Sequence, residues 1–196
     1  MGECAIIYSR DEERDKRKGR KKLKKCLTDH RKCAIISTRK GKENKPMRKT
    51  LVFDMDGTIA NFYGVKGWLD YLKAEDTTPY EQALPLYDMK NLADLLKRLK
   101  TKGWTIAVTT WLSKGGSKEF NNRTRVAKLE WLAKYEFPYD EIHLVQYGTT
   151  KANCTRHIGG YQVLVDDNDT IRKGWHLGAT INANYNIITE IEKLAA

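Results

Sequence analysis

Long apolar runs are missing from this sequence. Although 40% of the residues are hydrophobic, no stretch approaches the roughly 18 consecutive apolar residues that a membrane-spanning helix requires. The N-terminus lacks the charged-then-apolar pattern of a secretory signal peptide. In addition, Ile6 occupies the position at which an N-myristoylation signal requires serine or threonine. We therefore expect a soluble, cytoplasmic protein without a membrane partner.

Cysteine is also scarce, and its distribution is uneven. Three of the four cysteines (Cys4, Cys26 and Cys33) precede residue 50, so that only Cys154 remains in the rest of the chain. A single cysteine cannot form a disulfide within its own domain, which fits a reducing compartment. The early cysteines and His30 are zinc-ligand types, but their spacing matches no common zinc module, so a zinc site there is the less favoured interpretation.

The sequence beyond residue 49 has no net charge. Residues 50–196 contain 18 basic and 18 acidic residues, whereas residues 1–49 contain 18 basic and 7 acidic ones and so hold the whole net charge of +11. The nearly all-charged run at 10–25 cannot bury enough apolar surface to fold by itself. We therefore expect a basic N-terminal segment, 1–49, that is extended or disordered, and one domain of ordinary size, 50–196.

Three interpretations of the basic segment remain open. It is a solvated tail, or it precedes a natural start at Met47, or it binds the phosphate backbone of a nucleic acid. The first two are favoured because charged runs are usually solvated. A backbone contact would make binding strongly dependent on salt.

Apolar periodicity in residues 50–196 predicts alternating strands and helices. Short apolar runs bounded by turn residues predict five strands, at 50–53, 104–110, 142–145, 161–165 and 179–181. Strands that alternate with helices form βαβ units, which build a parallel sheet covered on both faces. The predicted fold is therefore an α/β, Rossmann-like three-layer sandwich with a mostly parallel five-stranded sheet.

Three helices are predicted from apolar spacing. The first begins after Asn91 as N-cap, carries leucines at helical spacing and ends at Gly103. The second has four apolar residues on its predicted buried face: Val126, Leu129, Leu132 and Ala133. The third covers residues 187–194.

A short, aromatic-rich insertion follows the first strand. Residues 59–88 contain Gly64, Gly67, Pro79 and Pro85, which interrupt regular helix, and only one or two helical turns are expected from Trp68 onward. We therefore predict a small cap at about 59–88.

Acidic and hydroxyl side chains stand at the ends of three predicted strands. The first strand runs into Asp54 and Asp56, which are followed at once by Gly57 and Thr58. Two close carboxylates suit a hard metal ion, or a division of labour between a nucleophile and an acid. For this motif alone, an Asp-rich turn without function is the alternative.

The other polar strand ends are Thr109 and Thr110 on the second strand, and Asp166 and Asp167 on the fourth. Open α/β sheets bind their ligands at the carboxyl ends of strands. Acids at two such ends and hydroxyls at a third favour a built site over chance.

These residues, with Lys151, resemble in type and order the four motifs of the haloacid dehalogenase-like superfamily. The resemblance covers residues 50 to about 175. Within the superfamily, Asp-Gly-Thr-Ile-Ala-Asn-Phe at 56–62 and Leu-Val-Asp-Asp at 164–167 are similar to the 5'(3')-deoxyribonucleotidases and their phage and bacterial relatives.

The resemblance implies a role for each motif. Asp54 would be the nucleophile that forms an aspartyl-phosphate, and Asp56 would be the general acid and then the base. A Mg²⁺ ion would be held by Asp54, the backbone carbonyl of Asp56, and the pair Asp166 and Asp167, of which the resemblance favours Asp167. Phosphate would be bound by Lys151 and by a threonine hydroxyl, Thr109 or Thr110.

The substrate implied by the resemblance is a nucleoside monophosphate. Phe62 aligns with an aromatic residue that packs on the substrate base, although as an apolar residue it equally suits the core, and Trp111 would line the entrance. Because the cap is shorter than in the nucleotidases, we expect a more open site with fewer walls for a base. The alternatives are a phosphatase of polynucleotide ends or of another phosphorylated partner tethered by residues 1–49, and an inactive nucleic-acid-binding protein.

Overall fold

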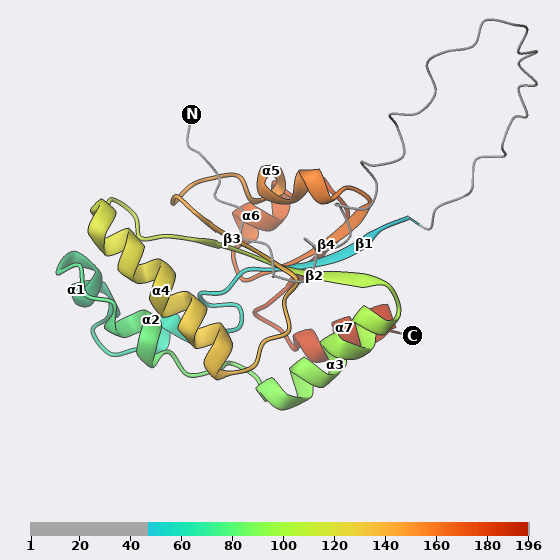
Figure 1. The fold of residues 1–196 in the computed structure, drawn as a ribbon, viewed down its shortest axis with the longest axis horizontal. Coiled ribbons are helices and arrows are strands. Elements are labelled where there is room, and N and C mark those ends of the chain that lie inside the picture. The colour runs from blue at the N-terminus through green and yellow to red at the C-terminus, as the bar shows by residue number, and fades with distance from the viewer. Residues whose placement is uncertain (1–46, 196) are drawn as a thin grey trace, which may run out of the picture. The chain divides into compact units, whose positions relative to one another are not determined.

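The structure, a computed structural model, describes residues 47–195 (Figure 1). The basic N-terminal segment and the cysteines at 4, 26 and 33 lie outside the described residues, so the predictions for them stay predictions. Among the residues described, no helix has the length and apolar content needed to cross a membrane.

Five parallel strands form one sheet, in the order β3-β2-β1-β4-β5. Their bounds are Lys49–Phe53 for β1, Trp104–Trp111 for β2, Glu141–Val145 for β3, Tyr161–Asp166 for β4 and Thr180–Asn182 for β5. Strand β1 is central, with Phe53 paired to Val108 of β2 and to Val165 of β4. Each strand lies within two residues of its prediction at either end, and the sheet is parallel throughout. The predicted α/β, Rossmann-like fold is confirmed.

Helices cover both faces of the sheet (Figure 1). Helices α3 (Met89–Thr101) and α7 (Ile187–Ala195) lie on one face, and α5 (Lys151–Thr155) and α6 (Asp169–Lys173) lie on the other. Alternate residues of β1 enter the two cores, because successive strand side chains point to opposite faces: Leu51 and Phe53 join the α3–α7 core, whereas Val52 joins the α5–α6 core. Packing against helices on both faces of the sheet therefore fixes the positions of the strand ends.

The start of α3 differs from the prediction. Its N-cap is Asp88, whose carboxylate accepts hydrogen bonds from the backbone N–H groups of Lys90 and Asn91. Asn91 therefore lies inside the first turn. The buried leucine face and the stop before Gly103 are as predicted.

The predicted buried face of α4 (Lys118–Lys134) is confirmed at Leu132, which is fully buried, and at Leu129, which packs against the core, but it is wrong at Val126 and Ala133. Val126 is 53% exposed and Ala133 is exposed, whereas Lys128 is fully buried. The residues that α4 buries are Phe120, Asn121, Thr124, Ala127, Lys128, Trp131 and Leu132. This face contains three polar side chains, so its apolar content does not distinguish it from the exposed face.

The segment between β1 and α3 forms the small cap. It contains a single 3₁₀ turn (Phe62–Gly64), α1 (Trp68–Lys73) and α2 (Thr78–Gln82). Helix α1 matches the expected short helix, but Pro79 does not interrupt a helix: it lies in the first turn of α2, where a missing N–H costs nothing. Phe62 and Tyr80 of the cap pack against Phe120 of α4, which fixes the cap to the main domain.

Candidate active site

The centre of the site is a buried lysine between two aspartates. Nζ of Lys151 lies 2.8 Å from Oδ1 of Asp54 and 2.7 Å from Oδ2 of Asp166. Asp54 follows β1, Asp166 ends β4, and Lys151 is the first residue of α5 rather than part of a loop as predicted. The parallel sheet thus brings together three of the predicted residues that are far apart in sequence.

Negative charge exceeds positive charge around this lysine. Burial, reinforced by the charge of Asp54, raises the pKa of Asp166 to about 6 despite its contact with Lys151. Burial and Asp54 likewise raise the pKa of Asp167. Burial alone would lower the pKa of Lys151, but Asp54 and Asp166 outweigh it and raise that pKa. Burial and the repulsion between carboxylates together therefore outweigh what one lysine contributes.

The same three aspartates fit a magnesium ion. Asp54, Asp166 and Asp167 each place a carboxylate oxygen within 4.8 Å of the others, and an all-oxygen donor set suits Mg²⁺. The oxygens of Asp166 already face Lys151 and the backbone N–H of Asn168, which leaves Asp167 the less engaged of the pair. The carboxylate of Asp56 is not in this cluster, so a contribution from Asp56 would have to come from its backbone.

Mg²⁺ should stabilise the protein more at neutral pH than in mild acid. The folded pKa of Asp166, about 6, lies above the ordinary aspartate pKa of 3.8. The contribution of Asp166 to the free energy of unfolding is therefore fully present below about pH 4, where its carboxyl group is protonated, and is lost as the pH rises through about 6. Ionising Asp166 in the folded protein lowers the free energy of unfolding by about 3 kcal/mol. A bound cation offsets that cost. We expect Mg²⁺ to raise the melting temperature by several degrees at about pH 7.5 and by much less at about pH 5. Equal increments at both pH values would contradict this assignment.

A second buried lysine holds Asp56. Nζ of Lys128, on α4, lies 2.5 Å from Oδ2 of Asp56 and donates to Oγ1 of Thr110 at 2.8 Å. The Lys128 side chain is fully buried, whereas that of Asp56 is 19% exposed. Burial and the charge of Asp54 raise the pKa of Asp56, and Lys128 opposes that rise. Asp56 is thus a carboxyl group that is suited to carrying a proton and has its own counter-ion.

Lys128 is the site residue that the sequence reasoning missed. A usable signal was present: Thr124, Ala127, Lys128 and Trp131 fall at i, i+3, i+4 and i+7, so that the lysine lies within a stripe at helical spacing. A lysine in such a stripe is buried only when it is paired.

The two candidate threonines have different surroundings. The hydroxyl of Thr110 accepts from Lys128. Thr109 follows the residue paired with Phe53, so it stands beside Asp54 on the same face of the sheet. Oγ1 of Thr109 is buried and has no hydrogen-bond partner among the described residues. Thr109 is therefore the better placed of the two to bind a phosphate beside Asp54.

The turn after Asp56 supports Asp167. The hydroxyl of Thr58 donates to Oδ1 of Asp167 at 3.3 Å and accepts from the backbone N–H of Asp167 at 3.2 Å. Gly57 has φ +79°, and a Cβ there would lie 2.7 Å from Oδ2 of Asp167 and 2.7 Å from the Tyr63 ring. The motif thus needs glycine for its backbone conformation and for the approach of Asp167.

Gly57→Ala should therefore remove the response to Mg²⁺. The matched control is Gly103→Ala, because Gly103 has φ +81° with nothing within 4 Å of its added Cβ. Both substitutions should cost about 1 kcal/mol or more in urea unfolding from backbone strain. Only Gly57→Ala should displace Asp167 and so lose the Mg²⁺-dependent rise in melting temperature. The same Mg²⁺ response in both variants would refute the close approach.

An aromatic pocket of about 410 Å³ opens onto Asp54 and Asp56. Phe62 is only 3% exposed and packs in the cap, but it also forms part of the pocket wall. At the end of β2, the Trp111 ring packs against Tyr147 at 4.8 Å and donates from Nε1 to the backbone O of Thr149. The small cap thus supplies a wall of aromatic side chains, where the sequence suggested few walls. The remaining lining residues are Tyr63, Trp68, Leu69, Leu72, Lys73, Tyr80, Leu112, Ser113 and Lys114.

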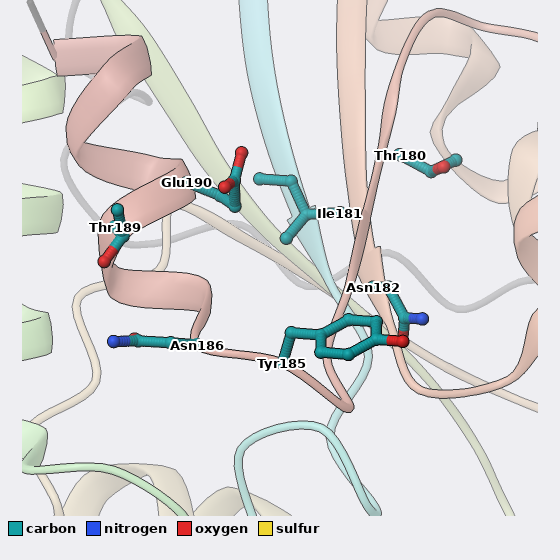
Figure 2. Close-up of a pocket in the computed structure, with 7 residues that line it drawn as sticks. All are labelled: Thr180, Ile181, Asn182, Tyr185, Asn186, Thr189 and Glu190. Atoms are coloured by element: carbon teal, nitrogen blue, oxygen red, sulfur yellow. The ribbon is translucent and has the colours of Figure 1, made fainter.

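A second hollow, of about 480 Å³, lies between β5 and α7 (Figure 2). Figure 2 shows amide and hydroxyl groups around it, among them Asn182, Asn186 and Thr189. Its lining includes Glu190 and no basic residue. An anionic phosphate would find no counter-charge there, so the smaller aromatic pocket is the candidate site.

Comparisons with known proteins leave the family open. No protein-family model matches the chain, and no curated protein matches it. Among solved structures it is similar to a D,D-heptose 1,7-bisphosphate phosphatase from Burkholderia thailandensis, with 16% identity and a TM-score of 0.40, over 67% of this chain and 75% of that chain. A likeness at this level carries no conclusion about activity, so the functional assignment rests on the geometry of this chain.

Proposed function

We propose that this protein is a Mg²⁺-dependent phosphomonoesterase of the haloacid dehalogenase-like superfamily. The observation that carries the proposal is the pairing of Lys151 with both Asp54 and Asp166 at the carboxyl edge of the sheet, with Asp167 beside them. A binding scaffold has no need to bury a carboxylate cluster with an excess of negative charge. A site that recruits a cation and an anionic substrate does.

In the first step, a carboxylate oxygen of Asp54 attacks the phosphorus atom of the substrate. A new oxygen–phosphorus bond forms at Asp54 while the bond to the ester oxygen breaks, and Asp56 donates a proton to the leaving alcohol. The raised pKa of Asp56 supports this role, because its proton is retained to higher pH than that of an ordinary aspartate.

In the second step, water attacks the phosphorus of the aspartyl-phosphate. Asp56, now ionised, takes a proton from that water, and the bond between Asp54 and phosphorus breaks to release inorganic phosphate. Lys128 holds Asp56 in place through both steps. Both catalytic carboxyl groups thereby return to their starting states.

The phosphoryl group is held by groups that this chain supplies. Lys151 is the cation next to Asp54, and the Thr109 hydroxyl, which has no hydrogen-bond partner within residues 47–195, is a donor for a phosphate oxygen. A Mg²⁺ ion bound by Asp54, Asp167 and Asp166 would neutralise charge on the carboxylates and on the phosphate.

The aromatic pocket supports a nucleoside monophosphate as the substrate. Nucleobases stack on aromatic side chains, and this contact tolerates different bases. Trp111 and Tyr147, together with Tyr63 and Trp68 of the cap, provide such surfaces in the pocket that Asp54 also lines. We propose deoxyribonucleoside monophosphates as the preferred members of this class.

A phosphate-release screen tests the proposal and separates it from the polynucleotide alternative. The full chain with Mg²⁺ is assayed on an aryl phosphate, nucleoside monophosphates, sugar phosphates and oligonucleotides phosphorylated at either end. We expect release from nucleotides to exceed release from sugar phosphates. Faster, salt-sensitive release from oligonucleotides would favour tethering by residues 1–49. No release from any substrate would leave the inactive binding protein as the better account.

A further inference from the structure

A second cluster of metal-ligand types lies where the proposed reaction makes no use of it. Glu141 and His143 are the first and third residues of β3, and His157 lies in the 3₁₀ turn Arg156–Ile158 that follows α5. Oε1 of Glu141 lies 2.7 Å from Nε2 of His143 and 2.6 Å from Nε2 of His157. All three ligand atoms lie within 4.8 Å of one another.

The backbone explains why these side chains converge. Residues two apart on a strand point to the same face, so Glu141 and His143 both project toward the face covered by α5. The two imidazole rings meet edge to face, with centroids 5.5 Å apart and an interplanar angle of 70°. One carboxylate oxygen is thus directed at two ring nitrogens from separate elements.

We propose that Glu141, His143 and His157 form a binding site for a zinc-type divalent cation. Two imidazole nitrogens and one carboxylate are a ligand set found in zinc sites that keep a fourth, open position. Imidazole suits zinc, nickel and copper ions, whereas all-oxygen sets suit magnesium. The chain would therefore carry two centres of different metal preference.

The tautomer of His157 fits this role. Its Nδ1 lies 3.0 Å from the backbone O of Cys154. A carbonyl oxygen only accepts hydrogen bonds, so Nδ1 carries a proton, and a cation bound at Nε2 would take the place of any proton that Nε2 shares with Glu141. A ligating histidine usually makes such a contact through its other nitrogen, because it fixes the ring for the metal.

Access and spacing also permit a cation. The His157 side chain is 41% exposed, which leaves a path from solvent, whereas His143 is fully buried and Glu141 is 14% exposed. Ligand atoms about 2.0–2.2 Å from a tetrahedral ion stand about 3.3 Å apart, so the two distances from Glu141 to the imidazole nitrogens must each widen by about 0.6–0.7 Å. His157 is exposed and Glu141 is partly exposed, so these two side chains can supply that movement around the buried His143. A bound ion would link β3 to the turn that follows the helix of Lys151.

Cobalt(II) substitution of the full chain, with excess Mg²⁺ to fill the aspartate cluster, tests the site. Tetrahedral nitrogen and oxygen ligands should give visible d–d absorption that saturates near one equivalent. Because Cys4, Cys26 and Cys33 could bind cobalt separately, the titration is done in a background with all three changed to serine. Residual sulfur ligation would also show as thiolate charge transfer.

His157→Ala should weaken cobalt binding by at least about tenfold, whereas His176→Ala, which removes an exposed histidine outside the cluster, should not change it. His157 is chosen because it is the exposed ligand, and far-UV circular dichroism checks that the variant is folded. Zinc should raise the melting temperature of the His176→Ala protein but not of the His157→Ala protein. Equal cobalt affinity in both variants, or no cobalt absorption in the triple-serine background, would overturn the proposal. The second result would make the cluster a Glu141–imidazolium ion pair only.

Discussion

Phosphate release falls by at least about 10³-fold when Asp54 is replaced by asparagine, if Asp54 is the nucleophile. The amide keeps the shape of the side chain but is a far weaker nucleophile than the carboxylate. We expect this loss in kcat with every substrate, including an aryl phosphate whose leaving group needs no proton. The measurement is steady-state phosphate release in Mg²⁺ by wild type and variant.

The Asp54→Asn protein should remain folded, which separates loss of chemistry from loss of structure. Asp54 raises the pKa of Asp166, so its neutralisation should bring that pKa down from about 6. The metal-free variant should then be as stable as wild type near neutral pH, or more stable. Asp70→Asn is the matched control because the Asp70 side chain is 83% exposed on the cap. Equal activity of wild type, Asp54→Asn and Asp70→Asn would rule out the proposed mechanism.

Lys128→Met should slow the reaction by up to about a hundredfold at neutral pH and move its pH profile. Lys128 opposes the rise in the pKa of Asp56, so its removal raises that pKa further. Asp56 then gives up its proton only at higher pH, and the step that needs ionised Asp56 slows. The acidic limb of the kcat profile should therefore move to higher pH, and activity should recover as the pH rises. A merely structural role would lower kcat without moving the limb.

Two further variants check that Lys128 acts through Asp56. Lys134→Met removes an exposed lysine from the same helix and should leave the pH profile unchanged. In an Asp56→Asn background, Lys128→Met should cost much less than it does in wild type, because the group on which it acts is gone. Fully additive losses would show that Lys128 supports the fold rather than Asp56.

The strands and their polar ends could be predicted because they depend on local sequence. A strand buried on both faces is a continuous apolar run, as at Leu51, Val52 and Phe53, and the chain marks its end with Asp54 and Gly57. Parallel pairing then brings the carboxyl ends of the strands together, regardless of the conformations of the loops. This is why Asp54 and Asp166 meet across two adjacent strands, as expected from sequence.

The features that sequence reasoning missed depend on tertiary partners. Helix α5 has only five residues, too few for a periodic pattern, so Lys151 was expected in a loop. The buried face of α4 contains a lysine whose charge partner, Asp56, lies 72 residues earlier in the sequence. The contact of His157 with Glu141 likewise joins a turn to a strand. None of these pairings has a signature within a short window.

Trapping of the aspartyl-phosphate tests the central claim most directly. Enzyme is mixed with an aryl phosphate and Mg²⁺, quenched in acid and reduced with borohydride, which converts a phosphorylated aspartate to homoserine. Asp56→Asn is the informative variant, because the aryl leaving group needs no proton while hydrolysis of the intermediate lacks its base, so the intermediate should accumulate. We predict homoserine at position 54 in the peptide mass spectrum. Continued phosphate release by wild type, with residue 54 recovered only as aspartate in both proteins, would contradict the account.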